Sequence, residues 1–357
     1  MAANNLLSAY RSELMAFAIL AILLTHINCD FGMFFINRIA LCCQGGVDAF
    51  FYLSGFGLYY SASKGTSLGK FYQKRAIRIF PSFLIIFLIY MCVKHNFSWE
   101  RLGWGGTTLA FWFPATRKYM FGWFVSTIMV LYAIFPLYYK CFKIHKRLAT
   151  LCAISIGLML TSIYAYWFLV LHPGGYNQYI LAAARIPIFF IGVYTAWYLN
   201  NATLSTTSRE RKRALAICIA IVVFALYNVG IDKWGFMAMR NSGMLYLPFM
   251  AIVPGVCIML GCIFDYANRF SIGKFLLSFL REIGSCTLEA YLLIGITYGY
   301  SKRLSQWWSI SELWSKLCLA AFTLVLAWIM HKVITSIVKN ICQRKKNVFI
   351  LHSNIKS

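Results

Sequence analysis

Long apolar segments alternate with short polar segments along the whole chain. Ten apolar segments stand out, with centres near residues 23, 54, 87, 130, 160, 188, 222, 254, 291 and 327. A helix needs roughly 20 apolar residues to cross a bilayer. No internal repeat and no polar segment of domain size interrupts the series. The pattern therefore predicts an all-α fold, a polytopic transmembrane helix bundle of about ten spanning helices that covers residues 1–340.

Composition supports this assignment. Hydrophobic residues make up 61% of the 357 residues and charged residues 12%, about half of the usual quarter. These proportions exclude a soluble enzyme, a disordered chain and a disulfide-stapled secreted domain. The 12 cysteines lie mostly inside the apolar segments and lack the paired spacing of a zinc site. We interpret them as small buried apolar residues and expect no bound metal.

The basic residues are distributed unevenly. The chain has 34 Lys and Arg residues against 10 Asp and Glu, and they form short clusters between the apolar segments. If the N-terminus is cytoplasmic and ten spans alternate, 23 basic residues face the cytoplasm, 10 face the outside, and Arg185 lies within a span. Cytoplasmic loops collect Lys and Arg. The distribution predicts two cytoplasmic termini, with residues 341–357 as a basic tail on the inner leaflet, and favours the lipid bilayer over nucleic acid as a partner.

Two ionisable side chains lie toward the outer ends of the first two predicted spans. His26 lies about two-thirds of the way along the first span, and Asp48 opens the second. A histidine in a protein-lined cavity can act as a general base, and a neighbouring carboxylate can fix its tautomer. The alternatives are a buried histidine satisfied by a neighbour and an aspartate that accepts from free N–H groups at a helix start. Both interpretations stay open from these residues alone.

Arg185 and Glu289 are charged residues at membrane depth. An Arg at a helix centre costs roughly 2.5–3.5 kcal/mol on insertion scales. Arg185 therefore requires a carboxylate, backbone carbonyls or a ligand as compensation. Glu289 requires a buried cation, and Arg185 is one of the cations available. A structural ion pair and contact with a substrate are both consistent with the sequence.

A basic cluster lies at the cytoplasmic entrance of the third predicted span. Lys74 and Arg78 are four residues apart and Arg75 and Arg78 three apart, so the three share one face of a helix. Such a face suits phosphate groups, because Arg offers a bidentate fork. The alternative, which charge alone favours, is ordinary anchoring of a cytoplasmic helix end.

These features occur in an order that resembles the integral-membrane acyltransferase-3 family. The most specific part is an early intramembrane histidine followed by Gly-Gly-Val-Asp-Ala-Phe-Phe-Tyr-Leu-Ser-Gly-Phe-Gly at 45–57 and Phe-Tyr-x-x-Arg-x-x-Arg-Ile-x-Pro at 71–81. Further similar motifs lie at 122–126, 131–136, 185–192 and 283–292. The resemblance covers roughly residues 10–335.

The resemblance implies an enzyme that moves an acyl group, usually acetyl, from cytoplasmic acyl-CoA to a hydroxyl of a glycan or glycolipid. It implies a bacterial inner-membrane location, acyl-CoA as co-substrate and no bound cofactor. His26 matches the family's essential histidine and is expected to act as the base, assisted by Asp48. Arg75 and Arg78, beside Lys74, match the arginine pair that helps to bind CoA. The residues expected in supporting roles are Arg11, Ser54, Arg185 and Glu289.

Two positions depart from the family's pattern. The family often has Arg or Lys where this chain has Met15, and we expect Arg11, one turn earlier on the same helix face, to supply that charge. The family also often has a histidine where this chain has Ile294. The first departure weakens any transfer of the family's arginine–histidine motif to this chain.

Other functions also fit a bundle with buried charges. A transporter or flippase for a glycan or small solute is the main alternative, although no pair of interrupted segments in matching halves indicates an inverted repeat. A second alternative is a structural or sensory membrane protein in which His26 is inert. A haem protein is disfavoured, because no two histidines are predicted to face each other across the bundle.

Overall fold

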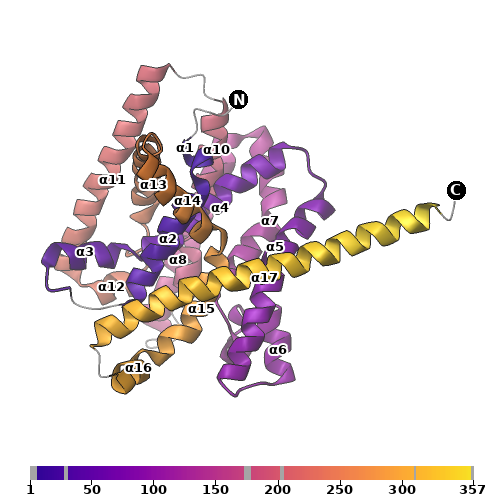
Figure 1. Ribbon diagram of the computed structural model, residues 1–357. Helices are drawn as coiled ribbons and strands as arrows, with labels where there is room; N and C mark the ends of the chain where they lie inside the picture. Colours follow the sequence, from indigo (N-terminus) through magenta and orange to yellow (C-terminus); the bar gives the residue numbers. More distant parts are fainter. Residues whose placement is uncertain (1–5, 28–30, 173–177, 202–204, 309–310, 355–357) are drawn as a thin grey trace. The chain divides into compact units, whose positions relative to one another are not determined.

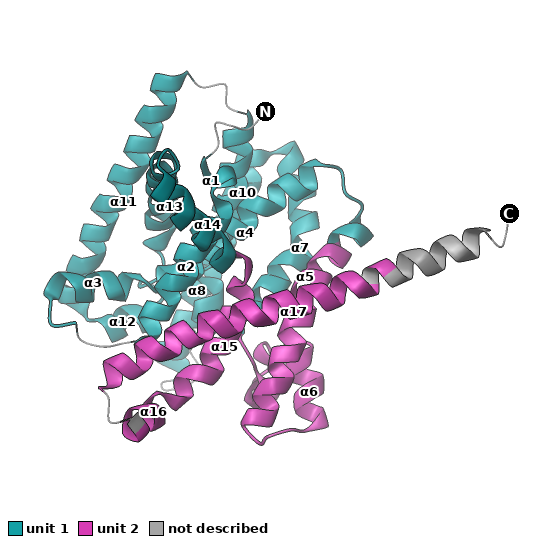
Figure 2. Cartoon of the chain, viewed as in Figure 1, with its two compact units in different colours: residues 1–71, 123–284 teal, residues 72–122, 285–357 magenta. Residues whose placement is uncertain are grey.

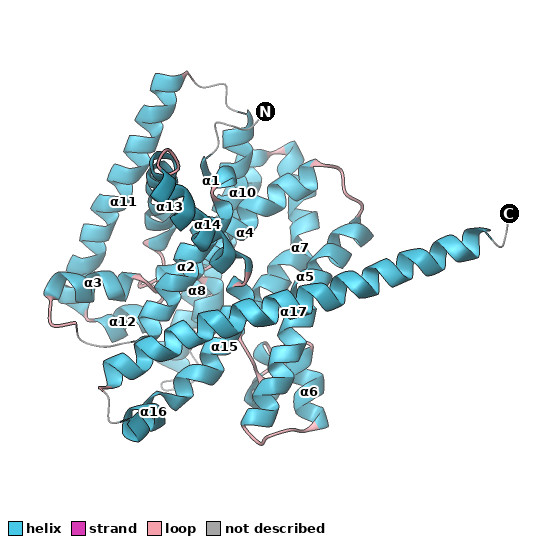
Figure 3. Ribbon diagram, in the orientation of Figure 1, coloured by secondary structure: helices cyan, strands magenta, loops and turns pink. Residues whose placement is uncertain are grey.

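The computed structural model of the protein describes residues 6–27, 31–172, 178–201, 205–308 and 311–354. Regular structure in these ranges is helical, and no β-strand occurs there (Figure 3). The predicted all-α fold is confirmed. Its physical reason is that a backbone in lipid must satisfy its own hydrogen bonds, which a helix does within one segment.

Eight helical segments in the described residues are long and apolar enough to cross a membrane. They contain the centres of eight of the ten predicted spans. The other two centres, near residues 23 and 291, fall in α2 and α15, which have 17 and 11 residues. Both are shorter than the roughly 20 residues of a full span. The polytopic helical membrane protein is confirmed, with these two helices shorter than the apolar pattern predicts.

The helices form two compact units (Figure 2). The first contains residues 1–71 and 123–284, and the second contains residues 72–122 and 285–357. The chain thus passes from one unit to the other three times. The tail expected from residue 341 does not begin at a helix end, because α17 continues from Glu312 to Asn354 (Figure 1). Residues 355–357 of that tail lie outside the described residues.

The first unit contains the helices that carry His26 and Asp48 and the turn that contains Arg185. Their bounds are α1 Leu6–Ala9, α2 Arg11–Ile27, α3 Phe34–Cys42, α4 Gly45–Ser63, α7 Trp123–Ile144, α8 Lys146–Tyr166, η3 Trp167–Leu171, α9 Gln178–Ala183, α10 Ile186–Asn201, α11 Thr206–Trp234, α12 Phe236–Asn241, α13 Phe249–Ala267 and α14 Ser271–Ser285.

The second unit contains the basic cluster and Glu289. Its elements are α5 Leu68–Val93, which begins four residues before the unit does, α6 Trp99–Gly106, η1 Leu109–Phe111, η2 Pro114–Tyr119, α15 Thr287–Thr297, η4 Tyr298–Tyr300, α16 Ser301–Trp308 and α17 Glu312–Asn354.

Glycines on α4 determine how closely the helices of the first unit pack. A Cβ atom on Gly55 would lie 2.0 Å from the carbonyl oxygen of Phe189 on α10. A Cβ atom on Gly46 would lie 2.4 Å from the carbonyl oxygen of Ala18 on α2. Small residues at such positions let the backbones of membrane helices approach one another. Helix α4 is therefore held against both α2, which carries His26, and α10, which follows Arg185.

Candidate active site

An ion pair joins α4 to the turn between α9 and α10. The Nη2 atom of Arg185 lies 3.4 Å from Oδ2 of Asp48, and the two side chains are 2% and 1% exposed. Nη1 of Arg185 also donates to the carbonyl of Leu181 at 3.1 Å. Arg185 lies in the turn itself, so its predicted span is interrupted there. A carboxylate and a backbone carbonyl thus compensate this buried charge, as burial in lipid requires.

Aromatic rings lie against the guanidinium of Arg185. Its Cζ atom is 4.1 Å from the ring centre of Tyr246 and 5.4 Å from that of Trp123. Such cation–π contacts stabilise a desolvated cation. Burial raises the pKa of Tyr246, and the positive charges of Arg185 and Arg240 partly offset that rise. The Tyr246 hydroxyl therefore stays protonated at physiological pH.

His26 lies in the last turn of α2 and its side chain is exposed. Its Nδ1 atom is 2.8 Å from the carbonyl oxygen of Ile22, one turn earlier. A carbonyl oxygen only accepts, so this contact assigns the proton to Nδ1 and the lone pair of the neutral ring to Nε2. That tautomer suits a base acting through Nε2. The sequence suggests Asp48 for the task of fixing the tautomer, but the structure pairs Asp48 with Arg185 and places Ile22 at Nδ1.

Arg11 connects the start of α2 to the middle of α4. Its Nε and Nη2 atoms donate to the carbonyl of Leu53 at 3.2 and 3.0 Å, and the guanidinium lies against Gly57. Ser54, the neighbour of Leu53, is buried on α4, as is Met15 on α2. Arg11 thus holds α2 against α4. Whether it also serves the reaction, as the sequence predicts, stays a prediction.

The basic cluster lies on α5 in the second unit. Lys74 and Arg78 are exposed, and Arg75 is half-buried. Because α5 is helical over this whole stretch, the three cations share a face as their spacing predicts. The cluster thus presents positive charge at one end of the helix.

Glu289 lies in the first turn of α15, in a cluster of polar side chains of the second unit. The Oγ atom of Ser82 on α5 donates to Oε1 of Glu289 at 2.6 Å. The Nδ1 atom of His331 on α17 lies 3.1 Å from the same oxygen. The sequence leaves the partner of Glu289 open. In the structure its partners are Ser82 and His331.

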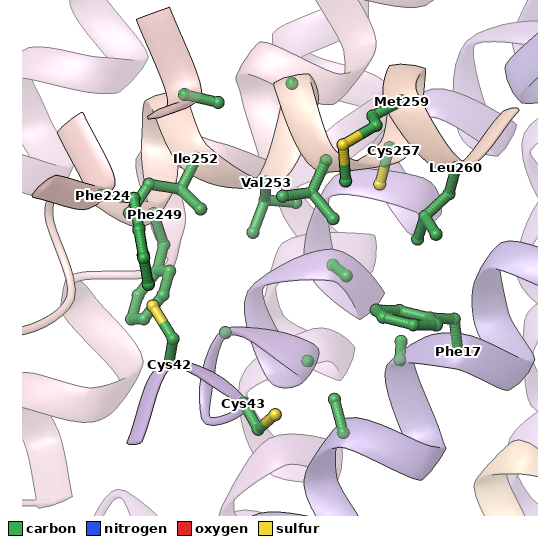
Figure 4. A pocket seen from close by; sticks show the side chains of 18 of the residues that line it. Phe17, Cys42, Cys43, Phe224, Phe249, Ile252, Val253, Cys257, Met259 and Leu260 are labelled. Atoms are coloured by element: carbon green, nitrogen blue, oxygen red, sulfur yellow. The ribbon is translucent and has the colours of Figure 1, made fainter. Parts of the chain in front are cut away.

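An apolar groove of about 330 Å³ lies in the first unit among α2, α3, α4, α11 and α13. Figure 4 shows Phe17 and Cys43 on one side of it and Val253 and Met259 on the other. Its lining side chains consist of carbon and sulfur. The volume is at the lower end of the range for small-ligand pockets, roughly 300–1,000 Å³.

The sequence assigns no role to four residues that the structure brings to these charges. Trp123 belongs to the family-like motif at 122–126, but that motif does not indicate a contact with Arg185, and Tyr246 carries no signal of its own in a chain with 22 Tyr residues. Ser82 directly follows the 71–81 motif, and nothing in the sequence indicates a role for it. His331 lies within the apolar span Glu312–Ile341, so the signal that identifies His26, a histidine in an apolar segment, was also present there.

These features define a polytopic helical membrane protein with buried charges and a histidine whose Nδ1 atom contacts a backbone carbonyl of its own helix. The chain matches the model of the acyltransferase-3 family, described as an acyltransferase domain, over residues 14–332. The protein belongs to this family, and it is a multi-pass membrane acyltransferase. A Haemophilus influenzae protein described only as uncharacterized is 24% identical over 249 residues, which cover 61% of this chain and 94% of that protein. No solved structure matches the chain.

Proposed function

We propose that the protein is an O-acyltransferase of the bacterial inner membrane. It moves an acyl group, most simply acetyl, from cytoplasmic acyl-CoA to a hydroxyl of a cell-surface glycan or glycolipid precursor. Membership of the acyltransferase family carries the reaction class. The observation that supports the chemistry is the contact of His26 Nδ1 with the Ile22 carbonyl, which leaves Nε2 as the basic atom.

The proposed reaction needs a base because a sugar hydroxyl is a poor nucleophile at neutral pH. Nε2 of His26 takes the hydroxyl proton as the oxygen attacks the thioester carbonyl. Asp48 is paired with Arg185 and takes no direct part in this step of the proposal. The Asp48–Arg185 pair positions α4, against which α2 packs at Gly46.

The proposed donor site is the basic cluster of Lys74, Arg75 and Arg78. CoA carries several phosphate charges, and arginine forks bind phosphate through paired hydrogen bonds. The exposure of Lys74 and Arg78 supports a role in contacting a ligand that arrives from water.

Replacing Arg75 and Arg78 together by alanine is expected to raise the KM for acetyl-CoA roughly 10- to 100-fold, because a hydrogen bond to a charged group contributes about 1.5–3 kcal/mol. The measurement uses purified protein in vesicles, radiolabelled acetyl-CoA and a mixed extract of bacterial glycans and glycolipids. The matched control is Lys140→Ala/Lys143→Ala, which removes two exposed cations three residues apart at the end of α7. An unchanged KM in the arginine variant would contradict the donor assignment. Movement of an acceptor without any acyl donor would favour the transporter alternative.

The apolar groove supports a glycolipid over a free glycan as the acceptor. Helices α11 and α13 both meet the requirements for spanning a membrane, and the groove's rim residues Phe17, Ile221 and Met259 are 44%, 59% and 37% exposed. In a bilayer such a rim faces lipid, so the occupant that fits is a hydrocarbon chain. The groove extends along α13 from Phe249 to Leu260, about 16 Å at the helical rise. That length is close to one leaflet, half of a hydrocarbon core of about 30 Å.

A side chain that fills this groove is expected to impair lipid-linked acceptors selectively. Ala21→Phe replaces a half-buried lining residue and should raise the KM for a glycolipid acceptor roughly tenfold, since each methylene left unburied costs about 0.8 kcal/mol. The KM for a water-soluble glycan with the same hydroxyl should not change. Ala321→Phe, at an exposed position of α17, is the control. Equal effects of Ala21→Phe on both acceptors would remove the groove from acceptor binding.

A further inference from the structure

The Ser82–Glu289–His331 cluster has the geometry of an oriented acid–base histidine. Both Ser82 Oγ and His331 Nδ1 contact the same carboxylate oxygen, at 2.6 and 3.1 Å. Ser82 is 4% exposed, and the side chains of Glu289 and His331 are 5% and 27% exposed. A buried carboxylate with an accessible histidine is the arrangement that orients an imidazole for proton transfer. Of the three side chains, that of His331 is the most accessible.

The Glu289 carboxylate determines which nitrogen of His331 can exchange a proton. Since an ionised carboxylate only accepts hydrogen bonds, Nδ1 carries a proton, and Nε2 is the atom that gives or takes one. A buried negative charge is costly unless it is paired. Protonated His331 makes the pair neutral and places a second proton on Nε2. In that protonated form the ring can donate a proton from Nε2 to a group beside it.

The cluster lies on the same face of α5 as the proposed donor site. Ser82 follows Arg78 by four residues and Arg75 by seven, and these spacings return to one face of a helix. At the helical rise, Ser82 lies about 6 Å beyond Arg78 and about 10 Å beyond Arg75. If the arginines hold the phosphates of CoA, the arm that ends in sulfur extends past them. The direction from Arg75 through Arg78 thus leads to the Ser82–Glu289–His331 cluster.

We propose that His331, positioned by Glu289, is the general acid that protonates the sulfur of CoA when the acyl group leaves. This inference rests on the proposed function. As the acceptor oxygen bonds to the acyl carbon, the carbon–sulfur bond breaks and its electron pair goes to sulfur. The Nε2 proton of His331 moves to that sulfur, so CoA departs as a neutral thiol. His331 becomes a neutral imidazole and takes up a proton again before the next turnover, which balances the proton that the acceptor hydroxyl released.

A general acid beside the CoA sulfur would avoid the release of an unhydrated thiolate. A thiolate is an adequate leaving group in water, but a charge released among apolar helices loses its hydration. Protonation during bond breaking avoids that cost. His331 is then a catalytic residue, whereas Glu289 and Ser82 are positioning residues that act through it.

The test varies the leaving group at constant shape. Acetyl-CoA is compared with the analogue in which selenium replaces the thioester sulfur, because a more acidic leaving group departs without a proton. His331→Gln keeps a hydrogen-bond donor for Glu289 and has no titratable proton. With acetyl-CoA it should lower kcat roughly 10²- to 10⁴-fold, the usual contribution of a general acid, and leave the donor KM unchanged. With the selenium analogue the loss should shrink at least tenfold, and Glu289→Gln should show the same pattern to a smaller extent.

The control is His26→Ala, whose loss should be equal with both donors, because a base acting on the acceptor is independent of the leaving group. An equal loss with both donors in His331→Gln would assign His331 a structural role and overturn the proposal. Unchanged kcat in His331→Gln would overturn it as well, while the proposed function stands. Absence of transfer by the wild-type protein would reject the proposed function and this proposal together.

Discussion

Replacing His26 by alanine is expected to lower kcat for acyl transfer roughly 10²- to 10⁴-fold, the range that general-base catalysis contributes. The reason is that the variant has no base to take the proton of the acceptor hydroxyl. In the wild-type protein that base is Nε2 of His26, because Nδ1 donates to the carbonyl of Ile22. The KM for acetyl-CoA should stay the same, because the proposed donor contacts belong to Arg75 and Arg78. The measurement is transfer of radiolabel from acetyl-CoA to the acceptor extract in vesicles.

Two further variants make this result specific to the imidazole. His26→Gln should be as inactive as His26→Ala, since glutamine has no basic nitrogen. His145→Ala removes an exposed histidine just before α8 and should transfer label at the wild-type rate. Equal labelling by the wild-type protein and His26→Ala would remove His26 as the base and favour the alternative in which this histidine is inert.

Replacing Arg185 by glutamine is expected to destabilise the first unit by about 3–5 kcal/mol, the cost of leaving one member of a buried ion pair alone. Asp48 would then hold a charge with 1% exposure and no cation. The loss should appear as a lower thermal unfolding midpoint of the detergent-solubilised protein, followed by tryptophan fluorescence.

The double variant Asp48→Asn/Arg185→Gln distinguishes the charge from the packing. It removes both charges and should restore most of the decrease in the unfolding midpoint, because no uncompensated charge remains. Arg38→Gln is the matched control: Arg38 pairs with Asp232, which is 57% exposed, and surface pairs contribute about 0–1 kcal/mol. If Arg185→Gln unfolds at the same temperature as Arg38→Gln, the buried pair does not hold α4 to the α9–α10 turn.

The different roles of Asp48 and His26 show the limit of reasoning from neighbouring spans. Short connections place the outer ends of the first two spans close together, which makes an Asp48–His26 contact reasonable. A carboxylate buried to 1% exposure, however, gains more from a full positive charge than from a neutral imidazole. Arg185, 137 positions later in the chain, supplies that charge. Sequence proximity suggested Asp48 as the partner of His26, whereas the contact seen at Nδ1 is the carbonyl of Ile22 on its own helix.

The basic cluster was more accessible to sequence reasoning. Lys74, Arg75 and Arg78 share a face because helical spacing alone determines which neighbours align. The prediction needed only that the segment be helical, and α5 is helical throughout. Ser82 belongs to the same face by the same rule, but its spacing carries no meaning until Glu289 and His331 are known to lie beside it.

By itself, the sequence determined the all-α membrane class, the centres of eight spans and the membership motifs of the acyltransferase family. These properties depend on local hydrophobicity and on residues close in the chain, which act through a helix period of 3.6 residues. Only the tertiary structure decided that Asp48 meets Arg185 and that Glu289 meets Ser82 and His331. Their partners lie 137, 207 and 42 positions apart in the chain. Which of several buried charges pair depends on helix packing, and the packing depends on close approaches such as that of Gly55 to Phe189, which no local pattern encodes.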